Sequence, residues 1–290
     1  MRRNRPIIQA LIGATIVAGG AIALAPSASA ITIPVACSEN ELVAAVNQAN
    51  STSAADTLVL ASNCTYRMTS SHGSSANGQE ALPVITTAIE MIGPATITRS
   101  TFLGLASYRI AEVSPTGSLT LTTGVNFTNG KALGDGGAIL NFGAVTLTKS
   151  SLSGNYASRD GGGLANADTA SGTAPAATFT RSPVSNNTTG RNGGGIYNGL
   201  RGTLTTSGVS GSPMEIKDNL ATSGRGGGIA AIASEATTLT QTVVTTNTAV
   251  RDSGGVYREG GTMTTTNSPI SANTTNNCVG SAPGVPDCTH

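Results

Sequence analysis

Hydrophobic and polar residues alternate in short bursts along most of this chain, and the bursts recur in a fixed order. The first burst holds an apolar residue between two threonines, at Thr120, Thr122, Thr146, Thr148, Thr178, Thr180, Thr203, Thr205, Thr238, Thr240, Thr262 and Thr264. The second has an apolar residue three positions before an asparagine, at Asn155, Asn187, Asn219, Asn247 and Asn273. The third is a glycine pair and a β-former, at 136–139, 161–164, 193–196 and 226–229, with a serine variant at 253–256. A unit of this kind cannot bury its apolar face alone and must stack on copies of itself.

Each burst predicts one short strand, because period-two alternation sends the apolar residue inward and the threonines outward. Glycine allows sharp corners with positive φ between the strands. Three strands per unit without an intervening helix predict an all-β, three-sided parallel β-helix of about seven coils. The residues between the threonines should form one buried file of Leu121, Leu147, Phe179, Leu204, Leu239 and Met263.

The recurring asparagine should stack at one corner, where each amide can donate to and accept from the neighbouring coil. The alternative is a set of turn-forming asparagines that are exposed to water.

Residues 1–30 have the features of a signal peptide. Arg2, Arg3 and Arg5 precede an apolar stretch over 7–25, and small residues end it at 28–30. A membrane anchor fits less well, because glycines interrupt the run, and no later segment approaches the ~20 apolar residues of a membrane span. We expect a secreted, extracellular protein and do not choose between general and twin-arginine export.

Residues 31–80 are predicted to form an N-terminal cap, 81–275 the β-helix, and 276–290 a closing tail. The capping-box spacing of Ser38 and Glu41, followed by apolar residues at helical spacing, predicts a helix over 38–50. Strands are expected over 57–61 and 65–68, and a polar loop with a solvated His72 over 70–81.

Four cysteines in an exported chain favour two disulfides, for which three pairings exist. The sequence-local pairs Cys37–Cys64 and Cys278–Cys288 would close the two ends of the array. The competing interpretation, in which Cys37 carries a lipid, would leave an odd thiol.

The mature chain is nearly neutral, which argues against nucleic acid as a partner. The three arginines of the leader belong to the 16 basic residues of the chain, so 13 remain against 15 acidic ones. No zinc spacing, phosphate-binding loop or known hydrolase motif is present, so no cofactor and no metal are predicted. We expect a monomer.

The repeats over 118–273 resemble those of chlamydial polymorphic outer-membrane proteins. They also resemble the β-helix proteins that actinobacteria secrete, where a GGGIYN segment such as 193–198 is typical. The resemblance implies a right-handed coil of the pectate-lyase-like (pectin lyase-like) superfold, and for the chlamydial members adhesion. Asn129 stands one place early in the first repeat, and no membrane barrel follows the array.

One column of the aligned repeats could carry chemistry. Asp135 and Asp160 precede the glycine corners on adjacent coils, with Arg159 one position earlier. Carboxylates about 5 Å apart suit a retaining glycosidase or the start of a Ca²⁺ site. The simpler interpretation is a solvated corner whose opposite charges pair between coils.

The function that the sequence favours is non-catalytic and adhesin-like, with an extracellular ligand such as a glycan or the cell envelope. Whether the protein is an enzyme stays open, and the alternative is a polysaccharide lyase or glycoside hydrolase. A third hypothesis is ice binding through the outward threonines, which would form a regular grid with spacings of ~4.8 by ~7 Å.

Overall fold

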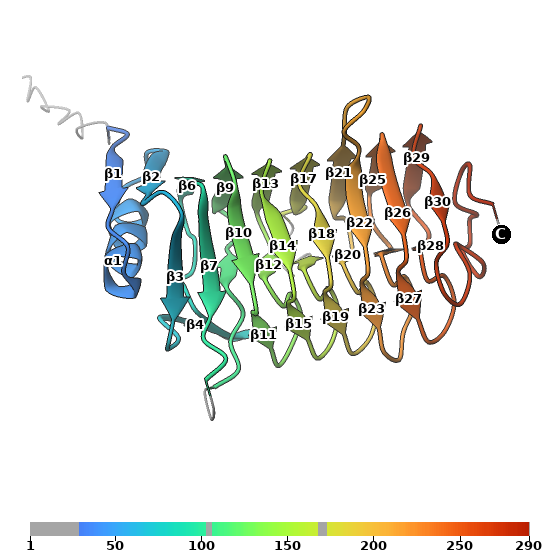
Figure 1. Cartoon of the computed structure of the whole chain (residues 1–290), viewed down its shortest axis with the longest axis horizontal. Coiled ribbons are helices and arrows are strands. Elements are labelled where there is room, and N and C mark those ends of the chain that lie inside the picture. Colours follow the sequence, from blue (N-terminus) through green and yellow to red (C-terminus); the bar gives the residue numbers. More distant parts are fainter. Residues whose placement is uncertain (1–28, 103–105, 168–172, 290) are drawn as a thin grey trace, which may run out of the picture.

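The described residues, 29–102, 106–167 and 173–289, form a right-handed parallel β-solenoid with one helix at its N-terminal end (Figure 1). This structure is a computed structural model, and it confirms the predicted β-helix and the capping helix. It has about eight turns rather than about seven. Residues 1–28, the bulk of the predicted signal peptide, lie outside the described residues.

The threonine bursts build the largest sheet, which we name the threonine sheet. Its nine parallel strands are β1 (Thr32–Val35), β2 (Asp56–Leu60), β6 (Ala88–Ile92), β9 (Ser118–Thr122), β13 (Ala144–Thr148), β17 (Ala176–Thr180), β21 (Thr203–Ser207), β25 (Ala236–Thr240) and β29 (Thr262–Thr266). The second sheet follows around the coil and ends at the asparagine corner. Its strands are β3 (Cys64–Met68), β7 (Ala95–Arg99), β10 (Val125–Thr128), β14 (Ser151–Ser153), β18 (Val184–Ser185), β22 (Met214–Lys217), β26 (Thr242–Thr245) and β30 (Ile270–Ser271).

A third sheet of two-residue strands lies between the asparagine corner and the glycine pair. Its strands are β11 (Lys131–Ala132), β15 (Tyr156–Ala157), β19 (Thr188–Thr189), β23 (Leu220–Ala221) and β27 (Thr248–Ala249). The fourth sheet begins after the glycines, with strands β8 (Ala111–Val113), β12 (Ile139–Asn141), β16 (Leu164–Asn166), β20 (Ile196–Asn198), β24 (Ile229–Ile232) and β28 (Val256–Glu259). The cross-section therefore has four strands per coil rather than the predicted three, because two residues are too few to show alternation.

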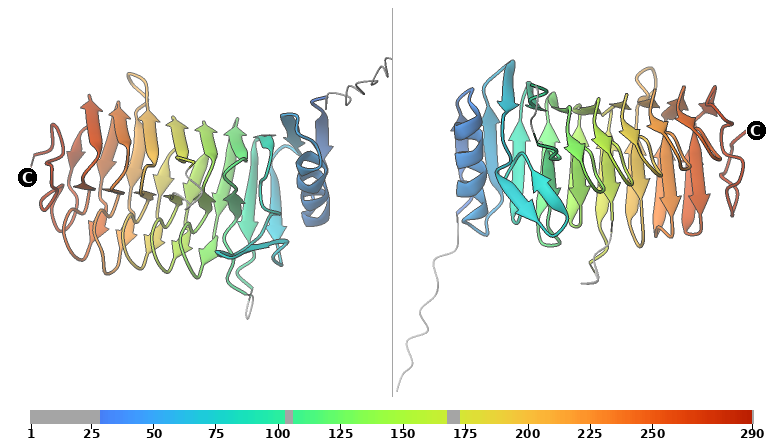
Figure 2. Two further views of the ribbon diagram at one scale, coloured as in Figure 1. Left: turned by 180° about the vertical axis from the view of Figure 1, so that it is seen from behind. Right: turned by 90° about the horizontal axis from the view of Figure 1, so that it is seen from below.

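The first coil begins earlier than the repeats indicate. Strands β2 and β3 already pair in parallel with β6 and β7, although their sequences lack the three bursts. The polar loop predicted over 70–81 holds a hairpin of β4 (Gly73–Ser75) and β5 (Gly78–Glu80). In Figure 2 this hairpin lies beside the first coils, and the Ser75 hydroxyl donates to Glu112 Oε2 of β8 over 2.8 Å. His72 is not simply solvated, because its Nε2 lies 2.8 Å from Glu39 Oε1.

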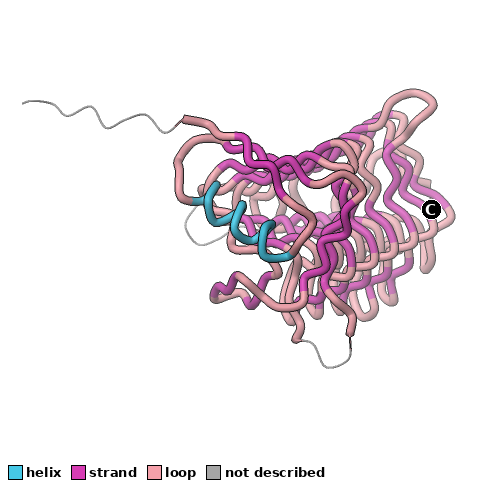
Figure 3. The backbone as a smooth tube through the Cα atoms, turned by 60° about the vertical axis from the view of Figure 1, so that its left-hand side comes forward, coloured by secondary structure: helices cyan, strands magenta, loops and turns pink. Residues whose placement is uncertain are grey.

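Both ends of the stack are covered, as predicted. Helix α1 (Glu39–Asn50) packs against β1, β2, β3 and β6 and lies over the leading end (Figure 3). Its N-cap is Ser38, whose hydroxyl accepts a hydrogen bond from the Glu41 amide. The predicted disulfide Cys37–Cys64 ties the segment before α1 to β3.

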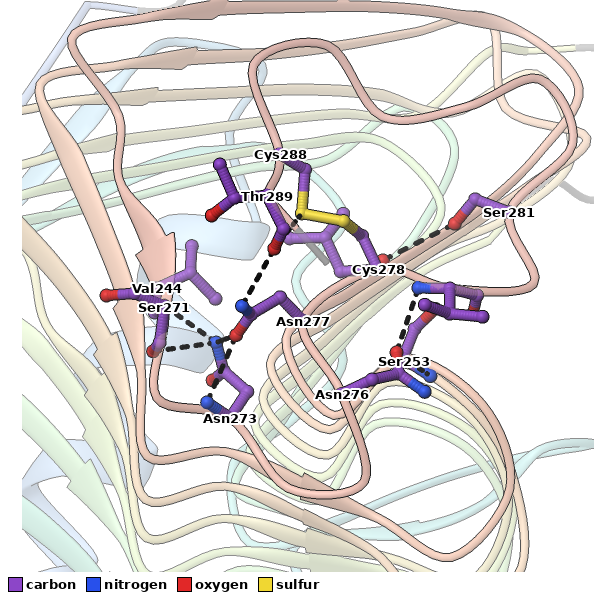
Figure 4. The surroundings of a disulfide bond; sticks show 12 residues. Val244, Ser253, Ser271, Asn273, Asn276, Asn277, Cys278, Ser281, Cys288 and Thr289 are labelled. Atoms are coloured by element: carbon purple, nitrogen blue, oxygen red, sulfur yellow. Dashed lines mark hydrogen bonds between the residues drawn. A yellow bond between two sulfur atoms is a disulfide. The ribbon is translucent and has the colours of Figure 1, made fainter.

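At the trailing end, the predicted disulfide Cys278–Cys288 closes the tail into a loop (Figure 4). Asn277 joins the tail to the last coil, because its Oδ1 accepts from Asn273 Nδ2 over 3.1 Å. Its own amide group donates to the Thr289 carbonyl over 2.9 Å.

The asparagine ladder is confirmed. Asn155, Asn187, Asn219, Asn247 and Asn273 stack with Nδ2 to Oδ1 distances of 2.9 to 3.0 Å. From Asn187 on, each Oδ1 also accepts from the backbone amide of the preceding asparagine, and the first four side chains are buried. A buried amide must find partners for all its polar atoms, so this column fixes the register of each coil on the last.

The predicted single file inside the threonine sheet is wrong at two places. Leu204 pairs with Ala177 rather than with Phe179, and Met263 pairs with Thr237. Thr206 and Thr265 therefore occupy the file of Leu121, facing inward. The displacement is two residues, and a shift of two keeps every side chain on its own face. The prediction of which face of each strand is buried is therefore unaffected.

Glycine corners account for only part of the turning. Gly161 has φ of 72°, and a Cβ on Gly162 would lie 2.3 Å from the carbonyl oxygen of Gly194 on the next coil, so both positions require glycine. The corner after the threonine sheet instead holds ordinary residues with positive φ, namely Thr123, Lys149, Arg181, Gln241 and Asn267. Stacking thus imposes the left-handed conformation on side chains that disfavour it.

We predict that Asn187→Ala lowers the free energy of unfolding by about 3 kcal/mol, because it leaves the buried amide groups of Asn155 and Asn219 short of partners. Chemical denaturation would measure the change. Asn186→Gly is the matched control: Asn186 is the exposed neighbour with φ of 56°, and glycine accepts that conformation. Equal stability of the two variants would contradict a structural role for the ladder.

Candidate functional site

The predicted acidic column lies along a groove on the outer face of the fourth sheet. The groove encloses about 350 Å³. Its lining residues are Asn77, Asp135, Leu140, Phe142, Arg159, Asp160, Ala167, Tyr197 and Leu200. The three candidate catalytic residues of the sequence, Asp135, Asp160 and Arg159, are thus brought together, and we name this the first groove.

The two carboxylates are tied into the backbone of the stack. Asp135 Oδ1 accepts from the amide of Asp160 over 2.9 Å, and Asp160 Oδ1 accepts from the amide of Asn192 over 2.9 Å. Asn192 Oδ1 accepts in turn from the amide of Arg225. The column therefore forms a ladder in which each side chain binds the backbone of the following coil.

Each of the two acids faces an arginine that comes from the following coil. Arg159 Nε lies 3.6 Å from Asp135 Oδ1, and an Arg191 guanidinium nitrogen lies 3.6 Å from Asp160 Oδ2. Both arginine side chains are more than half exposed. Long ion pairs whose guanidinium groups are solvated add little to stability.

Asp160 is the more buried of the two acids, with 6% of its surface exposed. Burial raises the pKa of its carboxyl, and hydrogen bonds from Asn192 and the charge of Arg191 only partly oppose that effect. The negative charge of Asp135 adds to the rise. Asp160 therefore holds a proton more readily than an ordinary aspartate does.

Tyr197 supplies an aromatic wall. Burial, followed by the negative charges of Asp160 and Asp135, raises the pKa of Tyr197 to about 12. Its hydroxyl is therefore neutral at ordinary pH, and none of the residues in the described part of the chain hydrogen-bonds to it. The ring packs against Gly199, where an added Cβ would lie 2.5 Å from Tyr197 Cε1.

The floor of the first groove is apolar. Leu140, Phe142 and Ala165 form a small buried cluster outside the solenoid core, with Ala167 and Tyr197 packed against it. Leu140, Ala165 and Tyr197 occupy one outward column of the fourth sheet. The repeat pattern does not predict this floor. The feature of the sequence that could have indicated it is Leu140, a large apolar residue at an outward position in β12.

A buried ion cluster holds one end of the first groove. Arg109, only 1% exposed, donates to Glu80 Oε1 over 2.5 Å and to Glu112 Oε2 over 3.2 Å. It also donates to the carbonyls of Asn77 and Asp135, which joins the hairpin β4–β5 to the acidic column. Glu80 Oε2 is buried without a hydrogen-bond partner.

A second groove, of about 390 Å³, lies nearer the C-terminal end of the fourth sheet. Its lining residues are Arg191, Asn192, Ser223, Gly224, Arg225, Ile232, Arg251 and Glu259. Arg191 belongs to both regions, because it lines the second groove and pairs with Asp160 of the first.

The predicted threonine grid lies on a different face from the grooves. One outward column is continuous and consists of Thr120, Thr146, Thr178, Thr205, Thr238 and Thr264. In the neighbouring column Thr122, Thr148, Thr180 and Thr240 are joined by Ser207 and Thr266. Thr203 and Thr262 are displaced from these two columns by the register shift and align with Ala176 and Ala236 instead.

The described residues contain no group of three or more histidine, cysteine, aspartate or glutamate side chains arranged to hold a metal ion. Within the same residues, no helix is long and apolar enough to cross a membrane.

We predict that stability falls as the pH rises from 5 to 8, through Glu80. Burial raises the pKa of Glu80 to about 7 despite the opposing charge of Arg109. A raised pKa in the folded state contributes stability below the unfolded value, 4.5, and loses it as the pH passes about 7. In Glu80→Gln the melting temperature should depend less on pH over this range than in the wild type.

Glu235→Gln, at an exposed carboxylate, is the control for the removal of one charge. If Glu80→Gln and Glu235→Gln leave the same pH dependence as the wild type, the buried cluster does not control it.

Comparisons of this chain with family models, curated proteins and solved structures give no match. The repeat architecture and the two grooves are therefore the basis for a functional hypothesis.

Proposed function

We propose that this protein is secreted and binds an extracellular glycan in the grooves of the fourth sheet, as an adhesin-like module without turnover. The observation that carries the proposal is the composition of the first groove. Apolar and aromatic groups form its floor, and carboxylate and guanidinium groups line its edge. Binding sites for small ligands combine apolar walls with a few fixed polar groups, and a sugar offers hydroxyls for the polar edge and C–H faces for the floor.

Secretion is supported by the leader-like residues 1–30 and by the two disulfides, which persist in oxidising surroundings. Adhesion is what the resemblance of the repeats to those of chlamydial polymorphic outer-membrane proteins implies. These arguments are independent of the grooves.

Binding without turnover is supported by the bonds that the two acids already make. Asp135 Oδ1 and Asp160 Oδ1 both accept from backbone amides of the following coil. A glycosidase needs one carboxyl group to donate a proton and another to attack or to activate water. Here both are engaged in holding the stack together.

We predict that Tyr197→Ala weakens glycan binding at least ten-fold, because it removes an aromatic wall and an unpartnered hydroxyl from the first groove. A glycan array would identify the ligand, and titration calorimetry would measure its affinity. The matched control is Tyr156→Ala, at an exposed tyrosine on the third sheet. Equal losses in both variants, or no binding to any glycan, would refute the proposal.

A lyase or hydrolase is the second candidate, favoured by the raised pKa of Asp160 beside Asp135. The wild type would then release reducing or unsaturated sugars from a polysaccharide panel, and Asp160→Asn would abolish the release while keeping the acceptor for the Asn192 amide. We expect no release. Turnover that Asp160→Asn abolishes would replace the binding function with catalysis.

A further inference from the structure

The second groove differs from the first in the sign of its charge. Among its lining residues, Arg191, Arg225 and Arg251 face the single acid Glu259. The first groove has Asp135 and Asp160 against Arg159. The two grooves of the fourth sheet are therefore acidic toward the N-terminal end and basic toward the C-terminal end.

Arg225 is held in a fixed position at the centre of the basic part. Its Nε donates to Asp252 Oδ2 over 3.2 Å, and its guanidinium lies 4.9 Å from the centre of the Tyr257 ring. A terminal nitrogen also donates to the Tyr257 hydroxyl over 3.2 Å, and that hydroxyl donates to Glu259 Oε2. Tyr257 is almost fully buried, so this network is part of the wall.

The side chains of Arg251 and Arg191 are less constrained than that of Arg225. Arg251 is exposed and has no hydrogen bond or ion pair from its side chain within the described residues. Arg191 has only its long contact with Asp160. A guanidinium presents donors in a planar fork that matches a carboxylate, a sulfate or a phosphate, and two such groups here are not already occupied by close partners.

We propose that the second groove binds an acidic substituent of the glycan, so that the ligand is an anionic rather than a neutral polysaccharide. The inference rests on the proposed function, since it assigns a chemical class to the ligand of the same grooves. In this arrangement the hydroxyl-rich part of the glycan lies along the first groove. The carboxylate, sulfate or phosphate group of the glycan lies between Arg191 and Arg251.

The experiment measures the binding of the full mature chain to matched polymers that differ only in charge. One set is dextran, carboxymethyl dextran and dextran sulfate. The other set consists of the array glycans with and without a uronate, sulfate or phosphate group. We expect acidic members to bind at least ten-fold more tightly than their neutral counterparts, and this preference to shrink as salt is raised.

The variant Arg251→Gln tests the site itself, and Arg67→Gln is its control, because Arg67 is an exposed arginine on the second sheet. We expect Arg251→Gln to weaken acidic binding about ten-fold, which corresponds to about 1.4 kcal/mol, and to narrow the ratio of acidic to neutral affinity. Arg67→Gln should change neither.

The outcomes separate the two proposals. Preference for neutral glycans, or acidic binding that Arg251→Gln and Arg67→Gln weaken equally, overturns the anionic ligand while the glycan-binding function stands. Absence of binding to every glycan overturns both. A preference for sulfate, carboxylate or phosphate among the acidic members identifies the source of the charge.

Discussion

The constraint on which the whole molecule depends is that each coil pairs in parallel with the coil before it and the coil after it. In the four sheets of the solenoid, successive strands are separated by a whole turn of chain, so the backbone hydrogen bonds between strands join residues distant in sequence. Equivalent residues of successive coils then lie about 4.8 Å apart in columns. A residue that interacts favourably with an identical residue on the next coil can therefore recur in every coil, as the buried asparagines do.

The same constraint decides what the acidic column can do. An aspartate at that corner lies beside the backbone amide of the next coil, and its Oδ1 accepts a hydrogen bond from that amide. The arginines one position earlier add a second partner. This edge therefore presents charged and hydrogen-bonding groups, with the apolar column of the fourth sheet beside it.

How far the sequence predicts this structure depends on whether a feature repeats. The ladder of Asn155 and Asn187 and the juxtaposition of Asp135 and Asp160 follow from aligning equivalent letters, and both are found. The register of β21 was mispredicted, because Thr-Leu-Thr-Thr-Ser fits the sheet in two ways that bury the same face.

Features made by unique residues escaped prediction for another reason. The floor around Leu140 and Phe142 is closed by Leu200 and by the hairpin residue Asn77, which come from different coils and share no motif. The buried Arg109 cluster likewise depends on glutamates contributed by β5 and β8. Periodicity shows where strands lie but not how their irregular connections meet.

The covalent closure at the two ends has a consequence for the lifetime of the protein. A linear stack in which each turn contacts only its neighbours loses its terminal turns most easily, since they have a neighbour on one side only. Here α1 and Cys37–Cys64 secure one terminus, and the looped tail with Cys278–Cys288 secures the other. Fraying is thus restrained at the ends, where it would ordinarily start. A protease that cleaves only unfolded segments then depends on local unfolding of the central coils.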